Sequence, residues 1–116
     1  MEYSVLMSVY YKENPIYLEQ SMGSIYNQTV PTDDFVLVCD GPLTDELNAV
    51  INEMHNKFGD ILHVVRLPKN VGLGNALNEG IRHCRHELIA RMDSDDISYP
   101  DRCEKQLSIF EKKFRD

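Results

Sequence analysis

The chain has 116 residues, a length that suits one small domain and leaves no room for two. Its hydrophobic content of 42% and charged content of 27% are ordinary for a soluble globular domain. The net charge is −7, from 12 basic and 19 acidic residues. This balance argues against a nucleic-acid partner, because binding a phosphate backbone needs a basic face. A single diphosphate held by a metal ion remains compatible with it.

Cysteine usage and hydropathy point to the cytoplasm as the expected compartment. The three cysteines are widely spaced and odd in number, so neither a disulfide framework nor a cysteine metal site is expected. Met1-Glu2-Tyr3 carries no basic cluster before an apolar run, which argues against a signal peptide. No apolar run approaches the roughly 20 residues that span a bilayer.

Strand and helix patterns alternate four times along the chain. Apolar runs predict strands at residues 4–9, 35–39, 61–67 and 87–92. Apolar residues at helical spacing predict helices at residues 15–25, 47–58, 73–84 and 100–116. Asn14 caps the first helix, Pro15 takes its first position, Gly59 ends the second and Pro100 opens the last. The inner face of the last helix is expected to carry Cys103, Leu107, Phe110 and Phe114.

This order predicts an α/β fold with an open, mainly parallel sheet and helices on both faces. The run of residues 35–39 is apolar on both strand faces, as is typical of a parallel strand covered on both sides. In such sheets, ligands bind beyond the carboxyl ends of the strands. Tyr10, Asp40, Asn70 and Asp93 each follow the end of a predicted strand, so we expect them to converge on one edge.

The strongest local signal is the acidic motif within residues 91–100, Arg-Met-Asp-Ser-Asp-Asp-Ile-Ser-Tyr-Pro. Asp93, Asp95 and Asp96 repel one another unless a cation relieves them, and oxygen ligands select hard ions such as Mg²⁺ or Mn²⁺. The alternative is a solvated acidic turn that caps the next helix; the apolar strand before the motif and the proline after it favour the metal. An EF-hand loop is rejected, because Ser98 stands where that loop needs glycine and Ile97 stands at a ligand position.

At this motif the chain resembles family 2 glycosyltransferases, which have the GT-A fold. In that family an Asp-x-Asp motif holds the metal bound to the diphosphate of a sugar nucleotide. The resemblance implies that Asp95 is the metal ligand, that Asp93 contacts the ribose or the metal, and that Asp96 supports them.

The resemblance extends over the whole chain and implies a nucleotide site. Ser8 and Tyr10 match the opening strand, where a hydroxyl meets the nucleotide and a ring can stack on its base. Asp40 matches an Asp-Gly-Ser turn and would accept the imide N–H of uracil, although Cys39 and Pro42 depart from the common residues.

Residues 70–80 are similar to the family's Asn-x-Gly segment, so Asn70 and Gly72 are assigned to nucleotide binding. The segment is not a dinucleotide fingerprint, because Leu77 replaces a glycine and the third strand precedes it. Residues 9–13 and 40–45 look most like exopolysaccharide-building members of the amylovoran type.

We therefore expect residues 1–116 to be the nucleotide-sugar-binding half of a GT-A domain, truncated after the Asp-x-Asp helix. The implied activity is inverting transfer from a nucleotide diphosphate sugar, with UDP as the expected nucleotide, to a saccharide or lipid-linked acceptor in polysaccharide biosynthesis. The catalytic base is expected beyond Asp116, and the full-length protein could sit peripherally at the inner face of the membrane.

Two other functions fit parts of this sequence. A nucleotidyltransferase would need a glycine-rich loop after the first strand, and residues 10–14 contain no glycine. A non-catalytic α/β nucleotide-binding or regulatory module remains the alternative; a receiver domain would need acids after the first strand, where Ser8 and Tyr10 stand. The fourth strand is expected at a sheet edge, so the isolated chain is expected to self-associate there or through Phe110 and Phe114.

Overall fold

The computed structural model describes residues 2–114, with side chains through residue 112. Four parallel strands form one sheet in the order β3-β2-β1-β4. The strands are β1 (Ser4–Val9), β2 (Asp34–Cys39), β3 (Leu62–Arg66) and β4 (Ile89–Arg91). The helices are α1 (Pro15–Tyr26), α2 (Asp45–Phe58), the 3-10 turn η1 (Gly59–Ile61), α3 (Leu73–Ile81) and α4 (Arg102–Phe114). The expected α/β architecture is confirmed.

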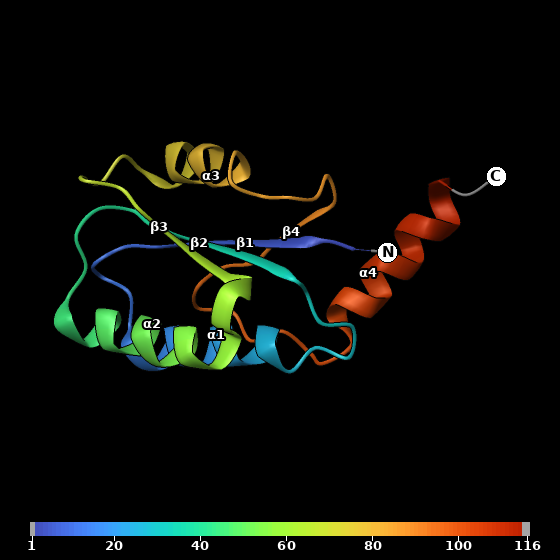
Figure 1. Ribbon diagram of the computed structural model, residues 1–116, viewed down its shortest axis with the longest axis horizontal. Helices are drawn as coiled ribbons and strands as arrows, with labels where there is room; N and C mark the ends of the chain where they lie inside the picture. The colour runs from blue at the N-terminus through green and yellow to red at the C-terminus, as the bar shows by residue number, and fades with distance from the viewer. Residues whose placement is uncertain (1, 115–116) are drawn as a thin grey trace.

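Helices cover both faces of the sheet, with α1 and α2 on one face and α3 on the other (Figure 1). Val5, Met7 and Val9 of β1 join the larger core under α1 and α2, while Leu6 joins the smaller core under α3. All six residues of β2 are buried. Because side chains alternate along a strand, β1 and β2 need apolar residues on both faces, as their sequences indicate.

The helix ends follow local chemistry. The Asn14 side chain accepts a hydrogen bond from the Ile16 backbone N–H at 2.8 Å, and Pro15 occupies the first helical turn. Thr44 caps α2 in the same way, accepting from the Leu47 N–H at 3.2 Å. Gly59 ends α2 with a φ of 63°, a conformation that side chains other than glycine rarely adopt.

Several helices and strands are shorter than the sequence predicts. The third strand begins at Leu62, because residues 59–61 form η1 instead. The fourth strand pairs with β1 over Ile89–Arg91 alone, although residues 87–92 were predicted. The third helix ends at Ile81 and not at Cys84, since the next N–H groups bond three residues back in a tightened last turn.

The last helix begins at Arg102, two residues after Pro100, and reaches Phe114. Cys103 and Leu107 are buried against the larger core, as predicted. Phe110 is half-buried, and the side chain of Phe114 lies outside the described residues. Only the first turns of α4 therefore contribute to the core of the described part of the chain.

A polar cluster closes the amino-terminal edge of the sheet. The buried Asp34 carboxylate accepts from the Ser4 hydroxyl at 2.6 Å and from the Arg85 backbone N–H at 2.8 Å. The Ser4 hydroxyl in turn accepts from the His86 backbone N–H at 3.1 Å. Nearby, the His86 ring lies 2.7 Å from the Asp33 carboxylate, and this hydrogen bond lowers the pKa of Asp33. The cluster fixes the chain where it enters β4.

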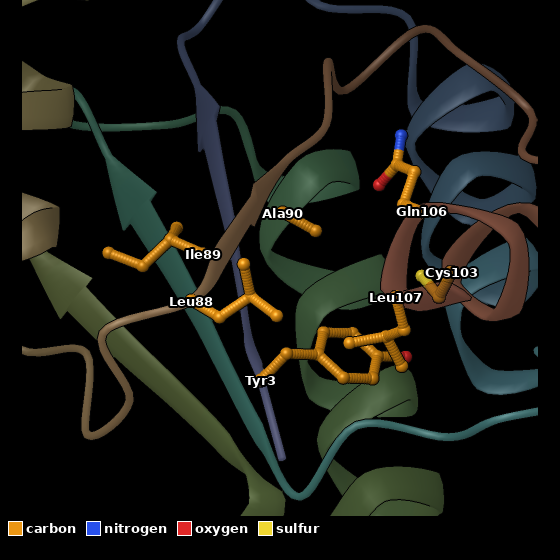
Figure 2. Close-up of a pocket in the computed structure, with 7 residues that line it drawn as sticks. All are labelled: Tyr3, Leu88, Ile89, Ala90, Cys103, Gln106 and Leu107. Atoms are coloured by element: carbon orange, nitrogen blue, oxygen red, sulfur yellow. The ribbon is translucent and has the colours of Figure 1, made fainter. Parts of the chain in front are cut away.

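The fourth strand lies at an edge of the sheet, as predicted. A small groove of about 40 Å³ runs between this edge and α4, and the Tyr3 ring lies beside Leu107 within it (Figure 2). Self-association through this edge stays a prediction. None of the helices in residues 2–114 has the length and apolarity needed to cross a bilayer.

Gly80 brings α3 into direct contact with the sheet and provides a test of the packing. A Cβ built on Gly80 would lie 2.4 Å from Leu6 Cδ1 and 2.7 Å from Val38 Cγ2, and both side chains are buried. We expect Gly80→Ala to lower the free energy of unfolding by about 1–2 kcal/mol, since overpacking outweighs the gain in helix propensity. Urea denaturation measures this, with Gly23→Ala in open space on α1 as the control. Equal stability of the two variants would contradict the close contact.

Candidate functional site

The parallel register brings the ends of three strands to one edge of the sheet. Val9 of β1 pairs with Cys39 of β2, and the ladder continues one residue further, with the Asp40 N–H donating to the Val9 carbonyl at 2.8 Å. Tyr10 and Asp40 are therefore neighbours along this edge. Asp93 follows β4 by two residues on the other side of β1.

Asp40 and the loop of residues 70–72 form one hydrogen-bonded unit. One carboxylate oxygen of Asp40 accepts from the Val71 N–H at 2.7 Å, and the other accepts from the Gly72 N–H at 3.1 Å. The Asn70 side-chain amide donates to the Asp40 carbonyl at 3.2 Å. The structure thus joins three of the predicted nucleotide residues, Asp40, Asn70 and Gly72, through hydrogen bonds.

Gly41 allows this close approach. Its φ is 90°, and a Cβ at this position would lie 2.7 Å from the Asn70 backbone nitrogen. Both the conformation and the space therefore require glycine. The contact between Gly41 and residue 70 was not predicted from the sequence.

Two of the expected base-binding features can be judged against this geometry. The Asp40 carboxylate offers about four lone-pair sites and uses two of them on Val71 and Gly72, and the residue is 3% exposed. The Asn70 amide nitrogen is engaged with Asp40, so this side chain supports the turn. Their contacts with a nucleotide stay predictions.

The segment after β1 presents exposed aromatic rings. Tyr10 is 45% exposed, and its ring meets that of Tyr11 edge to face, with centroids 5.8 Å apart. The Lys12 ammonium lies 5.8 Å from the Tyr11 centroid. Ser8, which was also assigned to the nucleotide, is half-buried and shares the α3 face of β1 with Leu6. Because the Tyr10 side chain is exposed, its ring is available for stacking.

Asp93, Asp95 and Asp96 gather at the end of β4. One carboxylate oxygen of each lies within 4.8 Å of the others, and all three residues are exposed. The Asp96 N–H donates to the Asp93 carbonyl at 3.1 Å, which closes a tight turn. Arg91 lies 3.8 Å from the Asp93 carboxylate. The three carboxylates offer only oxygen donors, and small side-chain rotations can bring these oxygens to one point. Such a set fits Mg²⁺ or Mn²⁺.

Helix α1 and Gln28, two residues beyond its end, hold the loop that carries these aspartates, through residues that sequence reasoning missed. Ser21 donates from its hydroxyl to the Ser94 carbonyl at 2.7 Å, and Gln28 donates from its amide to the Tyr99 carbonyl at 2.9 Å. The Ser94 hydroxyl also donates to the Glu13 carboxylate. The available signal was a row of polar residues beside the apolar stripe of this helix.

Cys39 stands directly before Asp40 and is fully buried. Burial raises the pKa of its thiol, so the side chain is neutral and packs as part of the larger core. No second charge therefore adjoins Asp40 at the end of β2.

Residues 4–116 match the profile of Glycosyl transferase family 2. The chain belongs to this family. It is 49% identical over 109 residues to the amylovoran biosynthesis glycosyltransferase AmsE of Erwinia amylovora, which covers 94% of the chain and 40% of AmsE. The family and the amylovoran-type likeness expected from the motifs are confirmed.

Solved structures show the same GT-A architecture. The chain is similar to S. aureus TarS 1-349 in complex with UDP-GlcNAc, with a TM-score of 0.79 and 27% identity over 97% of the chain and 32% of TarS 1-349. It is also similar to the mannosyltransferase PcManGT of Pyrobaculum calidifontis in complex with GDP-Man and Mn²⁺, with a TM-score of 0.76 and 25% identity over 93% of the chain and 31% of PcManGT. The chain spans less than half of the length of AmsE.

The link between Asp40 and residues 71–72 can be tested with an isosteric change. In Asp40→Asn one oxygen becomes an amide nitrogen that faces a backbone N–H, so a part-buried hydrogen bond from Val71 or Gly72 is lost. We expect the free energy of unfolding to fall by about 1–3 kcal/mol and the Val71 and Gly72 amides to exchange faster. Urea denaturation and amide hydrogen exchange measure this. The exposed Asp60→Asn is the control, and matching results for both variants would contradict the link.

Proposed function

We propose that this chain is the donor-binding part of a glycosyltransferase that takes its sugar from a nucleotide diphosphate sugar. The observation that carries the proposal is the shared edge on which an exposed aromatic ring, a buried aspartate and three clustered carboxylates follow successive strands. For the whole protein, we propose inverting transfer to a saccharide or lipid-linked acceptor in polysaccharide biosynthesis. The likeness to AmsE supports this role.

A divalent cation, Mg²⁺ or Mn²⁺, is proposed to bind at Asp95 with Asp93. When bound, such an ion acts as a Lewis acid that stabilises the charge of a diphosphate leaving group. Asp96 adds negative charge beside the two ligands, and the turn from its N–H to the Asp93 carbonyl holds the three side chains on one side of the loop. The Mn²⁺ in the complex of PcManGT supports a metal at this fold.

The nucleotide is proposed to lie across the ends of β1 and β2. Tyr10 would stack on the base, and the free lone pairs of Asp40 would accept its imide N–H. Asn70 and Gly72 keep Asp40 in place through the turn that they share with it. The UDP-GlcNAc in the complex of TarS supports uracil as the base. PcManGT is in complex with GDP-Man, so the choice between uracil and guanine has to be tested.

The acceptor site and the catalytic base are proposed to come from outside these 116 residues. The chain spans 40% of AmsE, so most of that relative's length has no counterpart in it. A base has to reach the acceptor hydroxyl as it attacks the sugar, on the face opposite the leaving diphosphate. The residues described at the edge of the sheet fit the donor side of this reaction.

The metal role predicts that UDP binding depends on a cation. We expect the chain to bind UDP more tightly with Mn²⁺ than in EDTA, and Asp95→Asn to weaken binding in Mn²⁺ by roughly tenfold or more. Isothermal titration calorimetry measures both affinities. Asp45→Asn, an exposed first-turn residue of α2, is the control and should behave as the wild type. Equal affinity with and without the ion would remove the metal from the proposal.

The contacts of Asp40 and Tyr10 predict a preference for uracil. In competition binding with Mn²⁺ present, UDP should displace a bound nucleotide at lower concentration than GDP does. Tyr10→Ala should weaken UDP by about 1–3 kcal/mol, the range typical of base stacking on an aromatic ring. Tighter binding of GDP than of UDP would overturn the uracil assignment while leaving the metal site intact.

A further inference from the structure

We propose that a polar stripe on α1, made of Ser21, Ser24 and the adjoining Gln28, positions the acidic loop for metal binding. The stripe fixes the backbone that follows Asp93 and so sets the arrangement in which the three carboxylates meet a divalent cation. This inference rests on the proposed function, because it assigns residues that shape the same metal site.

Gln28 makes the most extensive contacts of the stripe. It lies two residues beyond α1 and is 6% exposed. Its amide nitrogen donates to the Ser24 carbonyl at 3.0 Å and to the Tyr99 carbonyl at 2.9 Å. Its amide oxygen accepts from the Cys103 N–H at 3.0 Å. One buried side chain therefore joins the end of α1, the end of the acidic loop and the start of α4.

The contact with Cys103 has a specific meaning for α4. The first N–H groups of a helix have no partner within the helix, and Cys103 is the second residue of α4. The Gln28 oxygen supplies the missing acceptor, in the role that a capping side chain usually fills from the preceding loop. The start of α4, and with it the end of the acidic loop, is thus set by a residue of another element.

The two serines hold the loop at earlier points. The Ser21 hydroxyl donates to the Ser94 carbonyl at 2.7 Å, and the Ser24 hydroxyl accepts from the Ser98 N–H at 3.0 Å. Ser21 and Ser24 lie one turn apart on α1 and Gln28 follows the end of the helix, and their contacts follow the loop in order from Ser94 through Ser98 to Tyr99. The loop that carries Asp95 and Asp96 is therefore attached on both sides of these residues.

The acidic residues need such attachment because their own interactions oppose the arrangement. Three like charges within 4.8 Å repel one another, and each side chain is exposed. Residues 93–100 form no helix or strand, so regular secondary structure does not hold them together. Attachment through the backbone keeps the carboxylates together before a cation arrives, which lowers the ordering cost of binding.

The test compares metal binding and loop protection in matched variants of the chain. Gln28→Met keeps the length of the side chain and removes its hydrogen bonds, while Gln20→Met, at an exposed position of α1, is the control. We expect Gln28→Met to weaken Mn²⁺ binding in the presence of UDP by about tenfold, the lower range for residues that orient metal ligands. The Cys103 amide should exchange faster, while β2 amides stay protected and Gln20→Met matches the wild type.

A milder variant covers the case in which Gln28→Met does not fold. Ser24→Ala removes the acceptor of the Ser98 N–H at a half-buried position where water can replace it. We expect it to fold, to expose the Ser98 amide to exchange, and to weaken Mn²⁺ binding severalfold. If Gln28→Met folds and binds Mn²⁺ with wild-type affinity, the inference is overturned and the proposed function is not. If Gln28→Met does not fold, wild-type Mn²⁺ affinity in Ser24→Ala has the same meaning. A wild-type chain that binds no Mn²⁺ would instead overturn the proposed function and this inference with it.

Discussion

The covering of β1 and β2 on both faces is the constraint on which the rest of the structure depends. Their side chains alternate between the core under α1 and α2 and the core under α3, so neither strand has a face to offer a ligand. Polar chemistry is therefore confined to the strand ends. Because the strands are parallel, these ends meet at one edge. Asp40 therefore lies next to Val9 of β1, and the acidic turn lies on the opposite side of β1 from Asp40.

The loops at this edge share a second requirement. Backbone N–H and C=O groups that lie outside helices and strands need hydrogen-bond partners there. Asp40 supplies acceptors for Val71 and Gly72, and Gln28 does the same for Cys103. Among the described residues, every buried side-chain nitrogen or oxygen has a hydrogen-bond partner. The same polar side chains that satisfy the backbone also decide where the functional loops lie, so stability and site geometry have a common cause.

Local signals in the sequence were sufficient for the elements and for the acidic motif. Apolar runs located the central strands, and the caps Asn14 and Gly59 located helix ends, since these depend on neighbouring residues. The fourth strand was predicted too long, because its extent depends on pairing with β1 and not on its own hydrophobicity. The roles of Gln28 and of the Asp40 carboxylate were out of reach for the same reason: their partners lie 75 and 31 residues away.

The alignment of α1 with the acidic loop also limits how this loop can change in length. A helix rises 1.5 Å per residue, so positions 21 and 24, which both lie in α1, are separated by roughly 4.5 Å along its axis. The loop contacts at Ser94, Ser98 and Tyr99 occur in the same order as their partners Ser21, Ser24 and Gln28. An insertion or deletion inside this stretch would shift every later contact out of step with the helix. Ile97, by contrast, is 64% exposed, so its side chain is free to be exchanged while the spacing stays fixed.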